Sequence, residues 1–257
     1  MASAKLYGTD LSTYTFTMSA TEDASYPLAN LSDYLTTTLW KSSVTTNGQT
    51  LKIDFGASNI SERDFCVLDG INFKDMDVSL QAADDSGFSS GLVTVATVSG
   101  GLGSGPFIFT FAGVTKRYWR LLFTDAFSLY PQVGNFFIDK AFDWTEPYDV
   151  PYRNANLSFE SEVTPALDGT LRSVQPYSGR KSWRFSLQKP GLSDTVRTNF
   201  QTFFNKVRGK HRPFYFLDVD GTTKALVRFD IDVDPSEVQA YNLNLFSEIV
   251  LVGQQTS

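Results

Sequence analysis

A period of two in short apolar segments is the feature of this sequence that most restricts its fold. Between positions 51 and 55, Leu51, Ile53 and Phe55 alternate with Lys52 and Asp54, the pattern of a strand with one face in water. Further short apolar segments follow, separated by turn signals, at 65–68, 78–80, 92–98, 107–111, 118–123 and 135–138. No helical period interrupts this part of the chain, so residues 1–142 are predicted to form one antiparallel β-sandwich.

Three segments of this first part have no strand pattern. The first twenty or so residues are expected to form a lead-in strand or arm. Residues 84–87 (Asp-Asp-Ser-Gly) predict a turn, and residues 99–106 (SGGLGSGP) predict a flexible hairpin tip.

The composition changes at residues 143–151 (DWTEPYDVP), where two prolines and three acidic residues interrupt the strand pattern. Such a change is typical of a boundary between domains. A chain of 257 residues is also long enough for about two domains. We therefore predict a second domain at 143–257.

The second domain contains one amphipathic pattern with helical spacing. Five apolar residues share one face of a helix predicted at about 193–208: Val196, Phe200, Phe203, Phe204 and Val207. Ser193 is suited to the N-cap, and Gly209 to a left-handed residue at the C-terminus. Strands are predicted around the helix at 182–187, 213–217, 225–233, 241–246 and 249–252. The fold class is therefore mainly β: a β-sandwich followed by a second β-sandwich crossed by one helix.

Charge and cysteine content exclude several classes of protein. The net charge of −6 argues against direct nucleic-acid recognition, which needs a basic surface. The single cysteine, Cys66, lies between Phe65 and Val67, permits no internal disulfide, and is expected to be a small buried apolar residue. The first residues lack the pattern of a secretory signal, and no apolar segment reaches the length of a membrane span. The chain is therefore expected to be made and folded in the cytoplasm without membrane insertion.

The residues needed for catalysis are scarce. The one histidine, His211, lies in a basic segment after the helix, and no nucleophile-elbow, phosphate-loop or dinucleotide motif is present. Asp218 and Asp220 belong to a tight turn, and the aspartates at 230, 232 and 234 alternate as on a solvated strand face. We therefore predict no enzyme activity, no cofactor and no metal site.

Two segments far apart in the chain resemble one known type of module. Residues 24–43 (ASYPLANLSDYLTTTLWKSS) lead into the strand at 50–56 (TLKIDFG), and residues 116–123 (KRYWRLLF) form a later strand. Together they resemble the discoidin-like, galactose-binding type of jelly roll, which usually binds a ligand without converting it. The resemblance implies that Trp40 belongs to the core. Many such modules hold a structural calcium near an Asp-Gly, whereas here Asp33 is followed by Tyr34.

The same resemblance directs attention to loops at one end of the sandwich. Candidate ligand-binding residues there are Asn72, Phe73, Phe127 and Tyr130, with Leu129 beside them. Aromatic faces stack on sugar rings and an amide can read hydroxyl groups. Ile71 stands where these modules usually carry a histidine or arginine.

Residues 144–257 resemble distal tail and tail-tube-like proteins of long-tailed bacteriophages in the order of their elements: strand, Pro-Gly break, Phe-rich helix, basic bend, aromatic strand and hairpin. The resemblance implies a hexameric or trimeric ring in the virion tail, assembled in the host cytoplasm and contacting other tail and baseplate proteins. The first domain would then bind host surface glycan or decorate the tail. The alternative is a free, non-catalytic, lectin-like carbohydrate-binding module. A tail-fibre hydrolase is disfavoured by the single histidine.

Overall fold

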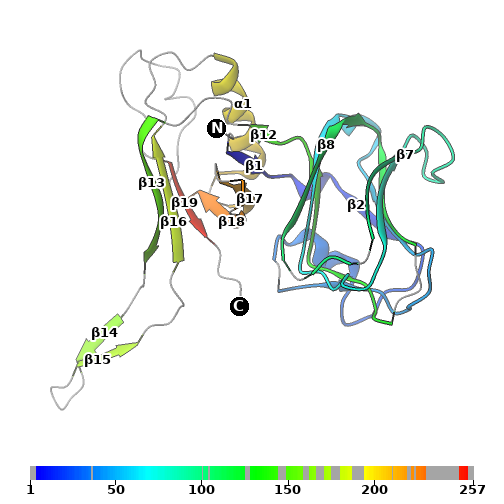
Figure 1. Ribbon diagram of the computed structural model, residues 1–257, viewed down its shortest axis with the longest axis horizontal. Helices are drawn as coiled ribbons and strands as arrows, with labels where there is room; N and C mark the ends of the chain where they lie inside the picture. The colour runs from blue at the N-terminus through cyan, green and yellow to red at the C-terminus, as the bar shows by residue number, and fades with distance from the viewer. Residues whose placement is uncertain are drawn as a thin grey trace. The chain divides into compact units, whose positions relative to one another are not determined.

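The protein, described by a computed structural model, divides into two compact units (Figure 1). The N-terminal unit is Tyr7–Ala141, and the C-terminal unit combines Met1–Leu6 with Phe142–Ser257. The structure describes residues 4–35, 37–99, 101–103, 105–124, 128–143, 149–158, 162–165, 171–174, 180–186, 194–209, 211–218, 221–222, 224–229 and 249–253.

The described residues of the N-terminal unit form two larger antiparallel sheets, a two-stranded ladder and three short helical turns. The larger sheet has the order β2-β4-β9-β6-β7 and consists of Thr15–Met18, Thr50–Asp54, Tyr118–Phe123, Val78–Ala83 and Val93–Val98. The smaller sheet has the order β11-β5-β8 and consists of Asn135–Asp139, Glu62–Asp69 and Phe107–Thr115. A two-stranded ladder pairs β3, Trp40–Lys41, with β10, Gln132–Val133. The 3-10 turns are η1, Leu11–Thr13, η2, Leu28–Ser32, and η3, Ala57–Asn59.

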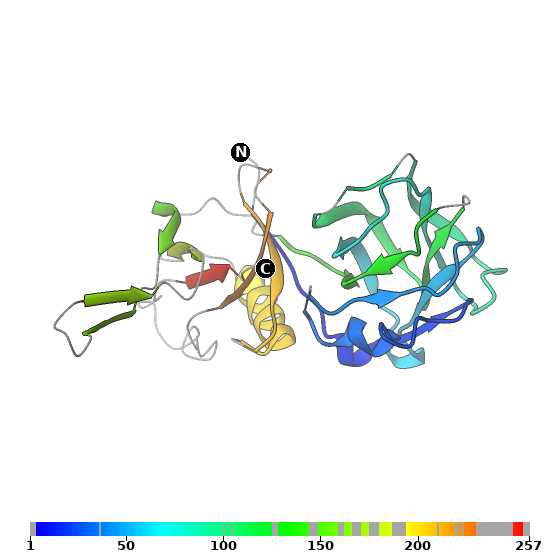
Figure 2. The same ribbon diagram turned by 90° about the horizontal axis from the view of Figure 1, so that it is seen from below.

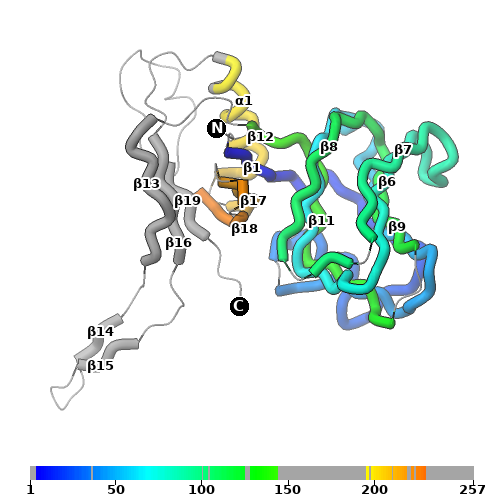
Figure 3. The backbone as a smooth tube through the Cα atoms, in the orientation of Figure 1, coloured from blue at the N-terminus to red at the C-terminus, as the bar shows by residue number. Residues whose placement is uncertain are grey.

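The two sheets pack face to face as a β-sandwich (Figure 3). Cys66 of β5 lines a small apolar cavity together with Leu80 of β6 and Leu121 of β9, so side chains of both sheets meet in the interior. Cys66 is fully buried, as the sequence predicted, and burial raises the pKa of its thiol. The predicted mainly-β architecture is confirmed.

From Phe65 onward strand β5 is buried on both faces, because Tyr7 at the end of β1 and the loop that carries Tyr34 cover the outer face of the smaller sheet. Phe65 packs edge-on against Tyr7, with ring centroids 5.0 Å apart, and Phe137 packs against Tyr34 at 5.9 Å. Tyr34 adopts a left-handed backbone conformation (φ 61°), and its hydroxyl accepts a 2.8 Å hydrogen bond from the Leu11 amide. The segments before β2 and β4 are therefore part of the core.

The glycine-rich segment at 99–106 is not the hairpin tip that the sequence predicted. Strand β7 pairs with β6 in the larger sheet, whereas β8 pairs with β5 in the smaller one, so the segment connects the two sheets. Leu102 within it is buried, and its amide donates to the Phe73 carbonyl at 3.1 Å. Gly101 has φ +98°, and a Cβ there would lie 1.4 Å from the Lys74 carbonyl oxygen. Only glycine fits this approach.

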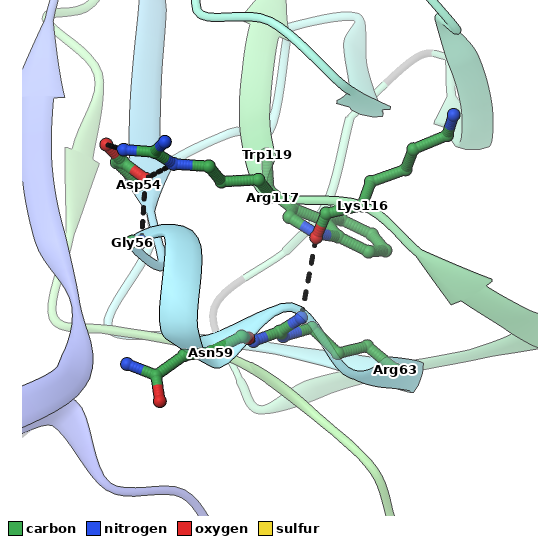
Figure 4. A network of polar contacts seen from close by, with 7 residues as sticks. All are labelled: Asp54, Gly56, Asn59, Arg63, Lys116, Arg117 and Trp119. Atoms are coloured by element: carbon green, nitrogen blue, oxygen red, sulfur yellow. Dashed lines mark hydrogen bonds and ion pairs between the residues drawn. The ribbon is translucent and has the colours of Figure 1, made fainter.

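A polar network closes the end of the sandwich where β4 ends and β9 begins (Figure 4). The Asp54 carboxylate accepts hydrogen bonds from Arg117 Nε at 2.7 Å and Nη2 at 2.9 Å, and a third from the Gly56 amide at 2.7 Å. Buried Arg63 donates to the carbonyls of Asn59 and Lys116, at 2.9 and 3.4 Å. These contacts tie the loops of this end together.

The described residues of the C-terminal unit form a seven-stranded sheet, a separate hairpin and one helix. The sheet order is β12-β1-β17-β18-β19-β16-β13, formed by Phe142–Asp143, Lys5–Tyr7, Phe214–Leu217, Lys224–Phe229, Ile249–Gly253, Arg180–Ser186 and Asp149–Ser158. A separate hairpin pairs β14, Glu162–Pro165, with β15, Leu171–Val174. The predicted strand at 241–246, the Ser193 cap and the aspartates at 220, 230, 232 and 234 lie outside the described residues.

Helix α1, Asp194–Val207, matches the predicted helix and lies along β17 and β18 (Figure 2). All five apolar residues of its predicted face are buried. Phe203 packs edge-on against Phe214 with ring centroids 5.2 Å apart, and Phe204 lies 5.2 Å from Phe229. Gly209 has φ +59° and donates its amide to the Phe204 carbonyl at 3.1 Å, which ends the helix. In the described part of the chain, no helix is long and apolar enough to cross a membrane.

The first strand belongs to the C-terminal unit, not to the sandwich that follows it in the chain. Lys5 pairs with Asp143 and Leu6 with Phe142, and the Lys5 ammonium lies 3.2 Å from the Asp143 carboxylate. Ala4 and Leu6 join the core under α1. The predicted boundary lies beside the observed change of unit at Phe142, but the chain up to Leu6 crosses it.

Replacing Phe203 by aspartate should unfold the C-terminal unit and leave the N-terminal unit folded. The substitution removes an aromatic side chain that is 3% exposed and places a charge among other rings, at a cost of about 3–5 kcal/mol or more. Scanning calorimetry of the full chain should show one transition lowered or lost. Asn199→Asp, on the exposed face of the helix, is the matched control and should leave both transitions in place. Equal shifts of both transitions would contradict the division into two units.

The Asp54–Arg117 pair should make part of the stability acid-sensitive. The Arg117 hydrogen bonds, with the Gly56 amide, lower the pKa of Asp54 from its ordinary value of 3.8. A carboxylate with a lowered pKa stabilises the folded state above its unfolded-state pKa, and this contribution disappears as pH falls through the folded-state pKa. Asp54→Asn should therefore cost up to about 1 kcal/mol at pH 7 and nothing at strongly acidic pH.

Urea unfolding at pH 7, 4 and 2.5 measures this difference. Asp75→Asn is the control, because Asp75 is exposed and has no ion pair among the residues described. A cost of Asp54→Asn that stays constant over this range would show that the carboxylate charge is not what stabilises this end.

Candidate functional site

The opposite end of the sandwich, where β9 ends and β4 begins, brings two loop segments together on either side of β3. On one side of β3, the Lys41 amide donates to the Tyr26 carbonyl at 3.1 Å, and the Asp23 amide donates to the Lys41 carbonyl at 2.9 Å. On the other side, Lys41 pairs with Gln132, and the Ser42 amide donates to the Pro131 carbonyl at 2.9 Å. The loops that carry Tyr26 and Tyr130 are therefore held on either side of Lys41.

Side-chain alternation along β3 sends neighbouring residues to opposite faces. Trp40 is 1% exposed, so it is a core residue as the resemblance implied, and Lys41 points the other way. The Lys41 ammonium lies 5.4 Å from the centroid of the Tyr26 ring and 5.3 Å from that of Tyr130. These distances are within the range of cation–π attraction. We call these three residues the tyrosine–lysine cluster.

The cluster is open to solvent and carries a positive charge. Tyr26 is 39% exposed and Tyr130 45%, and Leu129 beside Tyr130 is 49% exposed. Among the residues that the structure describes, no carboxylate lies within ion-pair distance of Lys41. Two acidic residues have main chains that pair with β3 and the residue after it, Asp23 with Lys41 and Glu22 with Ser42. Their carboxylates are used locally: Glu22 accepts from the Leu28 amide and Asp23 from the Ser25 amide.

Asn72 holds the Tyr130 loop in place. Its side-chain amide donates to the Tyr130 carbonyl at 2.8 Å, and its carbonyl oxygen accepts from the Gln132 amide at 2.9 Å. Both ends of the side chain are therefore engaged with the main chain on either side of Pro131. In this structure Asn72 positions Tyr130, whereas the sequence suggested that it would read a ligand hydroxyl.

The other predicted ligand-binding residues differ in their exposure to solvent. Phe73 is fully buried and packs edge-on against Phe123 with centroids 5.2 Å apart, so its ring is part of the core and cannot stack on a ligand. Phe127 lies outside the described residues. Tyr130 is exposed, as a binding residue must be. Asn72 and Tyr130 are therefore in contact in the structure, whereas Phe73 is buried.

Sequence reasoning missed Tyr26 and Lys41. Tyr26 precedes Pro27 in a loop rich in small and polar residues, which favours an exposed ring. Lys41 follows the core residue Trp40 in a strand, and alternation places it outward. These local signals existed, but nothing in the sequence alone shows that the two residues meet Tyr130.

Groups with shifted pKa values lie away from the cluster and support the fold. Burial raises the pKa of Tyr14, whose hydroxyl bonds Thr9 at 2.7 Å and the Ile138 carbonyl. Burial lowers the pKa of Arg63, which caps the far end of the sandwich. His211 is exposed beyond α1, and no group of three or more metal-ligating side chains is found among the described residues. The Asp33 carboxylate accepts hydrogen bonds from the Leu35 amide and from the Thr38 hydroxyl.

No protein-family model and no curated protein sequence matches the chain. Among solved structures, a chitosan-binding module from a chitosanase/glucanase of Paenibacillus sp. IK-5 is 23% identical and has a TM-score of 0.41, covering 49% of this chain and 94% of its own.

Two modules from Clostridium perfringens are similar in extent. The family 32 carbohydrate-binding module of NanJ, in complex with galactose, is 13% identical, with a TM-score of 0.43 and coverage of 52% and 98%. A family 32 module in complex with GalNAc-β-1,3-galactose is 10% identical, with a TM-score of 0.43 and coverage of 51% and 99%. These likenesses are weak, and the β-sandwich is established by its own strand order and register.

Replacing Asn72 by alanine should loosen the Tyr130 loop without unfolding the sandwich. Two hydrogen bonds to the main chain are lost, one of them from the half-buried Gln132 amide, at a cost of about 1 kcal/mol each. Hydrogen exchange should show faster exchange of the Gln132 amide, by several-fold. Asn47→Ala changes an exposed asparagine in another loop of the same end and serves as control. Unchanged exchange at Gln132 would contradict the role of Asn72 as a clamp.

Proposed function

We propose that the N-terminal unit is a non-catalytic carbohydrate-binding module and that the tyrosine–lysine cluster is its binding surface. The observation that carries this proposal is the pair of exposed rings, Tyr26 and Tyr130, held on either side of one lysine. The proposal corresponds to the lectin-like alternative considered from the sequence.

Aromatic rings suit sugars for a physical reason. The C–H face of a pyranose is apolar, and a flat aromatic face removes it from water while the sugar hydroxyls remain at its rim. Tyrosine also brings a hydroxyl that can donate and accept hydrogen bonds. Two such rings 39% and 45% exposed leave substantial aromatic surface free for a ligand.

The cluster is held in shape before any ligand arrives. A main-chain hydrogen bond fixes Lys41 to the carbonyl of Tyr26, and the Asn72 side chain fixes the carbonyl of Tyr130. Binding then requires little further ordering of the loops, which matters for a small ligand with few contacts. Irregular loops on a rigid sandwich are also where binding residues commonly lie.

Binding without turnover fits the groups around the cluster. Glu22 and Asp23, whose main chains pair beside Lys41, each accept a hydrogen bond from a loop amide, and the one histidine lies in the other unit. A glycosidase needs two carboxyl groups placed across the scissile bond. The cluster instead offers stacking surfaces and one cation.

The phage-tail role stays a prediction from the order of elements in the second half of the chain. It would give the C-terminal unit a ring-forming task and would make the N-terminal unit an accessory that binds host glycan. None of the contacts described above depends on that role, and glycan binding by the cluster is compatible with it.

Replacing either tyrosine by alanine should weaken carbohydrate binding about two- to tenfold, and the double substitution should weaken it by about the product of the two factors, since each stacked ring contributes roughly 0.5–1.5 kcal/mol. A glycan array would identify bound sugars, and isothermal titration would measure Tyr26→Ala, Tyr130→Ala and the double variant. Leu92→Ala, which changes an exposed apolar residue at the opposite end of the sandwich, is the matched control. Absence of binding by the unchanged protein, or binding unaffected by both tyrosine substitutions, would refute the proposal.

A further inference from the structure

The positive charge at the centre of the cluster bears on which sugars it would bind. Two tyrosine rings face the Lys41 ammonium at 5.3 and 5.4 Å. The ring faces attract the cation, but they carry no net charge and cannot neutralise it. An ion pair with a carboxylate would neutralise the charge of the ammonium. In the part of the chain that the structure describes, Lys41 forms no such ion pair.

We propose that the cluster binds acidic carbohydrates, with a sugar carboxylate accepting hydrogen bonds from the Lys41 ammonium while the tyrosine rings contact the sugar. This inference rests on the proposed function and names the class of its ligand. The ammonium offers three donors and no acceptor, so an anionic oxygen is its best partner. Charge-assisted hydrogen bonds of this kind are shorter and stronger than those made to neutral sugar hydroxyls.

The overall negative charge of the chain does not prevent such binding. The net charge of −6 is spread over 257 residues, and at physiological ionic strength charges more than about 8 Å apart are largely screened. The local contact therefore decides the preference. The acidic neighbours Glu22 and Asp23 are engaged with loop amides, at 2.6 and 3.0 Å. An attraction that depends on one local charge should also be sensitive to salt.

A competing role for Lys41 is to hold the two rings in position by cation–π contacts. The two roles differ in what they predict for charged and uncharged ligands. If Lys41 only positions the rings, its replacement should lower the affinities for acidic and for neutral sugars by the same factor. If Lys41 binds a carboxylate, its replacement should remove the difference between these two affinities.

The test compares carboxylated oligosaccharides with their own methyl esters, which keep the sugar rings and remove the charge. The probes are trigalacturonate, 3′-sialyllactose and a hyaluronan tetrasaccharide, each as acid and as ester, titrated into the full chain at pH 7. At least one acid should bind about tenfold more tightly than its ester. That preference should shrink as sodium chloride is raised from 50 to 500 mM.

Variants at position 41 assign the preference to the lysine. Lys41→Met keeps much of the apolar stem and should bind acid and ester equally, whereas Lys41→Arg keeps the charge and should retain the preference. Thermal melting equal to that of the unchanged protein confirms that both variants are folded.

The outcomes separate the two proposals. Equal binding of acids and esters by the unchanged protein, or a preference that survives Lys41→Met, overturns the acidic-ligand inference and leaves carbohydrate binding standing. No binding of any acidic or neutral glycan, on the array or by titration, overturns both. A loss of acid and ester binding in equal proportion in Lys41→Met assigns the lysine to ring positioning and likewise overturns the inference.

Discussion

The hydrogen bonding of β3 on both sides is the constraint on which the candidate site depends. A strand of two residues has few contacts of its own, and here the segment at Tyr26 and the ladder with β10 supply them. Each such hydrogen bond contributes only about 1 kcal/mol net. Burial of Trp40 stabilises the strand more strongly, because truncating a fully buried aromatic residue commonly costs about 3–5 kcal/mol. Trp40 therefore anchors the strand, and Lys41 is presented outward as a consequence.

Elements with a local cause could be predicted from the sequence. The helix at Asp194–Val207 follows from five apolar residues at helical spacing, and the structure buries all five against the sheet. Strand β4 follows from alternation, with Leu51 and Ile53 fully buried. In both cases the pattern within one element specifies which face must be covered, whatever covers it.

Features that depend on contacts between distant segments could not be predicted in the same way. Phe73 and Tyr130 are both aromatic residues in loops, yet one is buried against Phe123 and the other is exposed. The segment at 99–106 has the composition of a hairpin tip, but Gly101 is there because the Lys74 carbonyl leaves no room for a Cβ. Asn72 could equally well have faced a ligand. Its hydrogen-bond partners, the Tyr130 carbonyl and the Gln132 amide, depend on the position of the Tyr130 loop in the fold. No local sequence pattern encodes that position.

The path of the chain gives the sandwich the character of an insertion. Strand β1 lies between β12 and β17 in the C-terminal sheet, and Leu6 is the register partner of Phe142, so the sandwich leaves and re-enters that sheet at neighbouring positions. Chain ends that lie close together are typical of domains that tolerate insertion into another. A chain beginning at residue 143 would lack β1 and its buried Leu6, and would leave one side of β17 unpaired. The sandwich, by contrast, contains every residue of the tyrosine–lysine cluster and of its Asn72 clamp. Binding chemistry can therefore vary in its loops without altering the sheet that holds its two ends.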